Sequence, residues 1–288
     1  MKRHLLAMVL LGCGSAATTP DAPDAPDAAA DAPVPIDASV DGPRGVTCGN
    51  QPLCENFEAL PRGALTHNAR VGGFRADVQA GGTLAIDTTR AYSGTQSLKA
   101  HIDGGGSGGG RLWASGGVLF AQPRRHLYGR FMMWNATDAN SVHWTLFGAA
   151  GVVPSGPAAG HTTTYLFSAA EDKRWMAVFY DNQTNQDCWH HADEPVPVAT
   201  PSDHWTCVAF EAEADAIHYR LSLDGRAIDS FSVDTTGDGC LAVPGTTPWY
   251  GPDFDRFYLG AVSFHAMSGP LDVWFDDLVV DTAPVRCD

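Results

Sequence analysis

Short runs in which apolar and polar residues alternate recur along most of the chain. Alternation of this kind is typical of strands that bury one face, and Gly, Pro, Asn and Asp separate the runs as turn residues. Helical periodicity is nearly absent. The pattern predicts strands at Thr83 to Asp87, Gln96 to Ile102, Leu127 to Trp134, His143 to Phe147, Thr163 to Phe167, Trp175 to Tyr180, Trp205 to Glu211, His218 to Leu223, Phe257 to Phe264 and Leu271 to Val280.

Strands with one apolar face bury that face most simply when two sheets pack against each other. Between two of the predicted strands, Asp224-Gly225 carries the signal of a tight hairpin. We therefore expect an all-β fold, a two-sheet antiparallel β-sandwich of jelly-roll type. The glycine-rich stretch 104–110 is expected to be a flexible connection, and 148–160 either a lid over a groove or an idle surface loop.

The N-terminus has the order of an export signal. Lys2 and Arg3 precede an apolar run that ends before Gly12-Cys13, and Leu10-Leu11-Gly12-Cys13 is similar to the lipobox of bacterial lipoproteins. We expect a signal peptide over residues 1–12 and lipidation of Cys13, which would anchor an exported protein to the bacterial membrane or cell surface. The apolar run is shorter than the roughly 20 residues of a spanning helix.

The next segment, residues 13–45, is composed almost entirely of Ala, Pro, Asp, Thr, Ser and Val. Low hydrophobicity, frequent proline and charge of one sign predict a disordered, extended spacer. The remaining residues, 46–288, have the length of one large β domain that can bury a sizeable core.

Charge and cysteine content narrow the class of protein further. The formal net charge is −15, which argues against nucleic acid as a partner, because nucleic acid requires clustered cations. Of the 7 cysteines, the six beyond Cys13 suit disulfides in an exported domain. Cys48 and Cys54 could close a small loop and Cys287 could fix the C-terminus, but the sequence does not select one connectivity.

The 8 tryptophans are numerous for this length, and aromatic faces stack well on sugar rings. Tryptophans also pack in the core of a β-sandwich, where they have a structural role. We expect Trp205 and Trp274, which lie in long apolar strands, to be structural. Trp113, Trp189 and Trp249 are flanked by Gly, His or Pro and are expected to be exposed platforms for a sugar.

Several short motifs resemble one known family. They are Cys54 to Glu58, Arg90 to Lys99 and Val273 to Val280, with Tyr128 to Trp134 and Val142 to Trp144 between them. In this order they resemble the jelly-roll family of fungal glucuronan lyases and the cellulose-induced secreted protein related to them. The resemblance covers most of residues 50 to 285.

The resemblance implies a structural calcium ion. In such jelly rolls calcium often joins the first strand, a Ser-Gly turn and the last strand, and Glu58, Ser93, Asp276 and Asp277 stand at those places. Calcium prefers carboxylate and carbonyl oxygens, and two adjacent acids in an apolar strand are costly unless they are bound. Alternatively, one Asp faces solvent and the other accepts hydrogen bonds from the backbone.

The resemblance also implies lyase chemistry, which needs a group that neutralises a uronate, a base and an acid. The candidates are Arg130, His143 and Tyr180, in that order, since arginine binds both carboxylate oxygens and histidine suits a base. Alternation places Tyr128, Arg130 and Trp134 on one face, which could line a sugar groove. A rim salt bridge, a half-buried histidine and a core tyrosine are the structural alternatives.

One residue departs from the lyase pattern. Ser141 stands where the related alginate lyases carry a Gln, two residues before the histidine, so the neutralising group is open. His190-His191 could bind a metal, but adjacent residues on a strand point to opposite faces, so a solvated loop is expected instead. Further weaker candidates are Arg256, Tyr258, His265, His218 and Arg220.

Three functions follow from these patterns. The first is binding of polysaccharide by an anchored, monomeric jelly roll; the second is a polysaccharide lyase that cleaves uronate-containing glycan by β-elimination; the third is a structural or adhesion module. Arg, His and Tyr together in a groove would favour the lyase, and an aromatic groove without them would favour binding.

Overall fold

The computed structural model describes residues 45–46, 48–136, 142–169, 174–192, 199–215, 218–228, 233–234, 237–241 and 249–287. The chain divides into two units, Met1–Val40 and Asp41–Asp288, and all of the described residues belong to the second. Cys13 and its neighbours lie outside them. Within these ranges every regular element is a strand, and no helix there has the length and apolar character needed to cross a membrane.

The strands follow the predicted alternation, with several short additions. Their bounds are β1 Leu53–Glu55, β2 Gly63–Ala64, β3 Arg70–Val71, β4 Phe74–Gln79, β5 Gly82–Asp87, β6 Ser97–Ile102, β7 Gly108–Ser115, β8 His126–Asn135, β9 Trp144–Val152, β10 Thr162–Ala169, β11 Trp175–Asp181, β12 Gln186–His191, β13 Trp205–Glu213, β14 His218–Leu223, β15 Arg226–Ala227, β16 Val233–Asp234, β17 Gly239–Cys240, β18 Asp253–Ser263 and β19 Leu271–Asp281.

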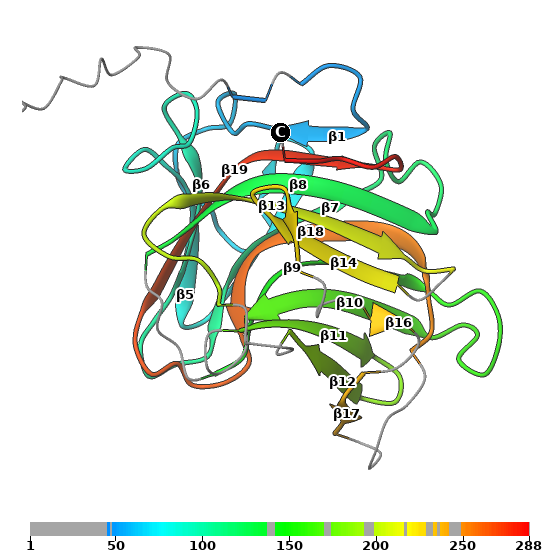
Figure 1. Ribbon diagram of the computed structural model, residues 1–288. Coiled ribbons are helices and arrows are strands. Elements are labelled where there is room, and N and C mark those ends of the chain that lie inside the picture. The colour runs from blue at the N-terminus through cyan, green and yellow to red at the C-terminus, as the bar shows by residue number, and fades with distance from the viewer. Residues whose placement is uncertain are drawn as a thin grey trace, which may run out of the picture. The chain divides into compact units, whose positions relative to one another are not determined.

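Two antiparallel sheets pack as a sandwich, which confirms the predicted jelly-roll class (Figure 1). The ten-stranded sheet has the order β15-β14-β13-β8-β19-β6-β5-β2, with β1 beside β19 and β16 beside β14. The nine-stranded sheet has the order β17-β12-β11-β10-β9-β18-β7-β4-β3. Figure 1 shows β10, β11, β12 and β17 side by side at one end of the nine-stranded sheet.

The core between the sheets is rich in aromatic rings. Phe147 of β9 stacks on Phe167 of β10 at 4.4 Å between ring centroids, and Phe210 of β13 lies 4.9 Å from Phe147. Trp249 belongs to this core with 0% exposure, so the prediction that it is an exposed platform is wrong: its ring packs against Phe179 and Tyr219. Trp274 is buried, as predicted.

Glycine-dependent turns and contacts fix two local features. Asp224 and Gly225 have φ of 47° and 76° between β14 and β15, which confirms the tight hairpin. The expectation of a flexible connection over 104–110 is wrong at its end, because Gly108, Gly109 and Gly110 begin β7. A Cβ on Gly109 would lie 2.1 Å from the carbonyl oxygen of Ala261, so the strands pack too closely there for a side chain.

Three disulfides join the six described cysteines. Cys48 and Cys54 close the small loop, and Cys207 with Cys287 holds the C-terminus to β13, as the sequence suggested. The third, Cys188 with Cys240, links β12 to the edge strand β17. It therefore fixes the edge of the nine-stranded sheet.

Candidate functional site

A groove of about 1190 Å³ lies on the face of the nine-stranded sheet that points away from the core. Leu112 and Ala114 of β7 point into the core, while Arg111 and Trp113, which alternate with them, line the groove. Each strand from β3 to β12 in the sheet order contributes a lining residue, and Leu241 directly follows β17. The groove thus crosses the strands rather than following one of them.

Cross-strand register arranges residues on this face of the sheet in two parallel rows, of which some members line the groove. We call one the aromatic row; its members are Trp113, Tyr258, Gly148, Leu166, Val178 and Trp189, each paired with the next on the neighbouring strand. We call the other the polar row; its members are Ser115, Arg256, Ala150, Thr164, Tyr180 and Asp187.

The aromatic row is a packed apolar surface. Tyr258, Leu166 and Val178 form a small buried cluster on this face, and Trp113 and Trp189 pack against it. Gly148 makes room for the neighbouring ring, because a Cβ there would lie 2.7 Å from Tyr258. Of this row, Trp113 and Leu166 line the groove, and Trp113 is half-buried. A partly exposed indole of this kind can stack against a sugar ring.

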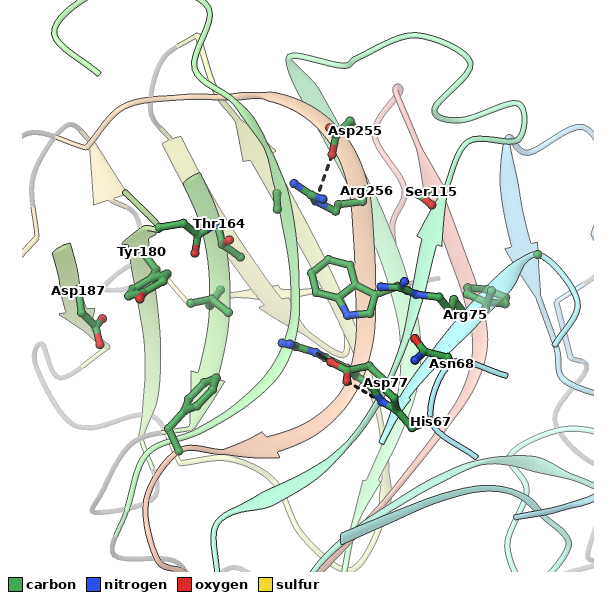
Figure 2. Close-up of a pocket in the computed structure, with 18 of the residues that line it drawn as sticks. His67, Asn68, Arg75, Asp77, Ser115, Thr164, Tyr180, Asp187, Asp255 and Arg256 are labelled. Atoms are coloured by element: carbon green, nitrogen blue, oxygen red, sulfur yellow. Dashed lines mark hydrogen bonds and ion pairs between the residues drawn. The ribbon is translucent and has the colours of Figure 1, made fainter. Parts of the chain in front are cut away.

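Arginines gather at the β3–β4–β7 end of the groove. Arg111 donates to Asp77 at 2.9 Å and lies over the rings of Trp113 and Tyr258 at 4.8 and 4.9 Å. Arg70 and Arg75 are exposed, and within the described part of the chain neither takes part in an ion pair. Figure 2 shows Arg75 beside Asn68 and His67 at this end. These two guanidinium groups are available to an anionic ligand.

The opposite end of the groove carries an acid without a partner. Asp187 of β12 stands directly across from Tyr180 of β11, and Figure 2 shows the two on neighbouring strands, remote from Arg75. Burial raises the pKa of Asp187 above its ordinary value, and His265 partly opposes the rise. No described residue hydrogen-bonds to or pairs with its carboxylate.

His143 and Tyr180 both line the groove but stand on opposite sides of the aromatic row. The His143 Nε2 lies 3.2 Å from the Ser168 hydroxyl, while Tyr180 pairs with Thr164. Thr164 and Ser168 are four residues apart on β10, or about 13 Å along the strand. The Tyr180 hydroxyl donates to Asn185. The structure therefore does not bring the predicted base and acid together.

Burial lowers the pKa of His143 to about 4, and the nearby His265 and His191 add to the effect. The imidazole is thus neutral at pH 7. The ring centroids of His143 and His265 are 6.0 Å apart.

Arg130 lies on the other sheet. Tyr128, Arg130 and Trp134 do share one face of β8, as alternation predicts, since Leu127, Phe131 and Met133 point into the core. That face is the outer face of the ten-stranded sheet and does not line the groove. Tyr128 donates to Glu213 at 2.7 Å, and the guanidinium of Arg90 covers the Trp134 ring at 3.9 Å. The prediction that this face of β8 lines a sugar groove is therefore wrong for the groove described above.

The adjacent histidines also differ from the prediction of a solvated loop. His190 and His191 lie in β12, and both rings hydrogen-bond to the carboxylate of Asp238, at 2.7 and 3.2 Å. The weaker candidates Arg256 and His265 line the groove, whereas His218 and Arg220 lie in β14 of the ten-stranded sheet.

The residues expected to bind calcium meet only in part. Asp276 accepts hydrogen bonds from the backbone N–H groups of Tyr92 and Ser93, and Asp277 accepts one from the Ser93 hydroxyl at 2.9 Å. Burial raises the pKa of Asp276 to about 7, backbone hydrogen bonds oppose the rise, and Asp277 adds to it. Glu58 accepts from the N–H groups of Thr95 and Gln96.

Two adjacent buried acids and a hydroxyl offer the oxygen ligands that calcium prefers. Among the described residues, however, no three His, Cys, Asp or Glu side chains gather into a metal site. Backbone carbonyls would have to complete the coordination.

The sequence pattern alone did not single out several residues that line the groove. They are Arg70, Arg75, Asp77, Arg111, Asp187, Leu241 and Phe264. Part of the signal was present, because Phe74 to Val78 and Arg111 to Ala114 alternate charged or aromatic with apolar residues. That alternation indicates one outward face in each strand.

The fold is a jelly-roll β-sandwich with a groove across one sheet. Residues 66–283 match the family described as polysaccharide-lyase-like, Cip1-like core domain, and the chain belongs to this family. A comparison with curated proteins finds no match.

Among solved structures, the protein titled "Cellulose induced protein, Cip1" is 18% identical with a TM-score of 0.55, over 82% of this chain and 100% of that one. Alginate lyase vAL-1 from Chlorella virus is 12% identical with a TM-score of 0.49, over 74% of this chain and 94% of that one. The first likeness shows a shared fold.

Proposed function

We propose that this protein binds polysaccharide in the groove of the nine-stranded sheet. The observation that carries the proposal is the aromatic row, an apolar strip that crosses successive strands and from which Trp113 and Leu166 line the groove. Stacking on such a strip holds a sugar chain without covalent chemistry. Membership of a polysaccharide-related family supports the ligand class.

A lyase is the second candidate, and one observation favours it. His143 lines the groove and is uncharged at pH 7, so its imidazole can accept a proton, although a pKa of about 4 makes it a weak base at that pH. Arg111 would then neutralise the uronate in place of Arg130, because it is the arginine held over the aromatic row. The positions of His143 and Tyr180 argue against this candidate. His143 lies beside Ser168 and Tyr180 pairs with Thr164, and these two residues of β10 are about 13 Å apart along the strand.

Affinity electrophoresis and an elimination assay separate the two candidates. Full-length protein is run through gels that contain xylan, glucuronic-acid-substituted xylan, polygalacturonate or alginate, and the same polymers are assayed for the ultraviolet absorbance of unsaturated uronate. We expect retardation without absorbance. Elimination by the wild-type protein, reduced by two to four orders of magnitude in His143→Ala while retardation persists, would replace binding with lysis. Migration unaffected by every polymer would reject both candidates.

We propose in addition that calcium stabilises the domain through Asp276, Asp277 and Ser93. The bound ion would neutralise two adjacent buried carboxylates, which are costly when unpaired. Glu58 as a fourth ligand remains a prediction, because the N–H groups of Thr95 and Gln96 already hold its carboxylate.

The anchor is a further part of the proposal and rests on Leu10-Leu11-Gly12-Cys13. Replacement of Cys13 with Ser should release the protein from membranes in a fractionation experiment. A wild-type protein that is already in the aqueous fraction, or a Ser variant that remains with membranes, would contradict lipidation at this residue.

A further inference from the structure

The two ends of the groove differ in charge and in apolar exposure. Arg70 and Arg75 lie on β3 and β4, without an ion pair in the described part of the chain. Asp187, an acid, lies on β12 and also lines the groove. From β4 to β12 the sheet order gives six inter-strand spacings, or about 29 Å along the sheet. A ligand that contacts both ends must therefore extend over several sugar residues.

The Asp187 end is built for uncharged sugar. A carboxylate without a protein partner accepts hydrogen bonds from sugar hydroxyl groups but repels another carboxylate. Leu241, a large apolar side chain that is 74% exposed, also lines the groove. Leu241 is tied to this end, since its N–H donates to the carbonyl oxygen of Asp187 at 2.9 Å. Apolar side chains of this kind can cover the apolar face of a sugar ring.

The arginine end is built for a carboxylate. Arg75 stands across from Trp113, so a sugar stacked on that indole would have a guanidinium beside it. Asp77 already pairs with Arg111 and lies 3.4 Å from His67, which leaves Arg70 and Arg75 as the free cations. A guanidinium binds both oxygens of a carboxylate, and the pair is charge-assisted.

We propose that the groove is specific for a mixed glycan, in which a uronic acid is held at Arg70 and Arg75 and neutral sugars are held at Asp187 and Leu241. This inference rests on the proposed binding function and specifies its ligand class. A polymer made only of uronic acid would place a carboxylate against Asp187, and a neutral polymer would leave the arginines unused.

The test measures the affinity of the full-length protein for three polymers: glucuronic-acid-substituted xylan, unsubstituted xylan and polygalacturonate. The mixed polymer should bind about tenfold more tightly than either of the others. Asp187→Asn, which keeps the shape of the side chain and removes its charge, should strengthen binding of polygalacturonate by about fivefold to tenfold. Arg75→Gln should weaken binding of the mixed polymer by about tenfold.

Arg220→Gln is the matched control, because it removes the same charge from the other sheet, where Arg220 pairs with Glu211. It should leave all three affinities unchanged. If the wild type binds polygalacturonate as tightly as the mixed polymer and Asp187→Asn changes nothing, the mixed-glycan inference is wrong while the binding function stands. If none of the three polymers binds, and none retards the protein on the affinity gels, both fail.

Discussion

Two desolvated carboxylates, one in each sheet, differ in the partners that surround them. Asp276 of the ten-stranded sheet accepts from the backbone N–H groups of Tyr92, Ser93 and Asp277. Asp187 of the nine-stranded sheet has no such donor among the described residues, and it faces the groove. Burial raises the pKa of both. Desolvation alone therefore does not distinguish a structural acid from a ligand-binding one; the hydrogen-bond donors do.

The largest expected effect is the pH dependence of stability that Asp276 causes. An acid with a higher pKa in the folded chain binds more protons when folded, so its stabilising contribution is present at low pH and lost as pH rises through the folded value. The rise from 3.8 to about 7 corresponds to about 4 kcal/mol at most. In chelator, the free energy of unfolding should fall between pH 4 and pH 8.

Asp276→Asn is the control for that titration, since it removes the acid and keeps the shape. His143 acts in the opposite sense, because its pKa is lowered and its contribution is lost as pH falls from 6.5 towards 4. The difference between the wild-type and Asp276→Asn profiles isolates the carboxyl. Parallel profiles would show that Asp276 has an ordinary pKa.

Alanine substitution should distinguish Asp276 from Asp187 by its effect on the free energy of unfolding. Asp276→Ala leaves the N–H groups of Tyr92 and Ser93 without an acceptor, which should cost about 3 kcal/mol of unfolding free energy. Asp187→Ala removes no side-chain hydrogen bond to a described residue and should change stability by less than about 0.5 kcal/mol. Urea denaturation in chelator measures both. Equal destabilisation would mean that Asp187 has a structural partner.

Calcium should act on one acid and not on the other. A ligand that binds only the folded state stabilises it by about 2.7 kcal/mol at a hundredfold excess over its dissociation constant. Calcium should raise the melting temperature of the wild type and of Asp187→Asn, but not that of Asp277→Asn. An unchanged wild-type melting curve, with no metal in elemental analysis, would remove the site.

Alternation identified most strands and their inward faces, because the two-residue period of a strand is local information. It could not assign a strand to a sheet. Arg130 was placed on the correct face of β8, yet β8 joins β13 and β19 in the ten-stranded sheet, away from the groove. Sheet membership depends on pairing between residues remote in the chain.

The same limit explains the remaining differences at the site. Trp249 has turn-forming neighbours in the sequence but is enclosed by Phe179 and Tyr219 from other strands. The glycines of β7 suggested flexibility, although Gly109 is required by the close approach of the Ala261 carbonyl of β18. The sequence does not single out Asp187, because the lack of a described partner for its carboxylate depends on which residues surround it in the fold.

Calorimetric titration of two tryptophan variants tests whether polysaccharide binds along the aromatic row. Trp113 lies in the row and Trp134 lies on the outer face of the other sheet, beneath Arg90. The ligand is the polymer that retards the protein most on the affinity gels. Trp113→Ala should bind it about tenfold more weakly than the wild type, a loss of about 1.4 kcal/mol of binding free energy. Trp134→Ala should bind it like the wild type. Equal affinities for Trp113→Ala and the wild type, or a larger loss of affinity in Trp134→Ala, would show that polysaccharide does not bind along the aromatic row.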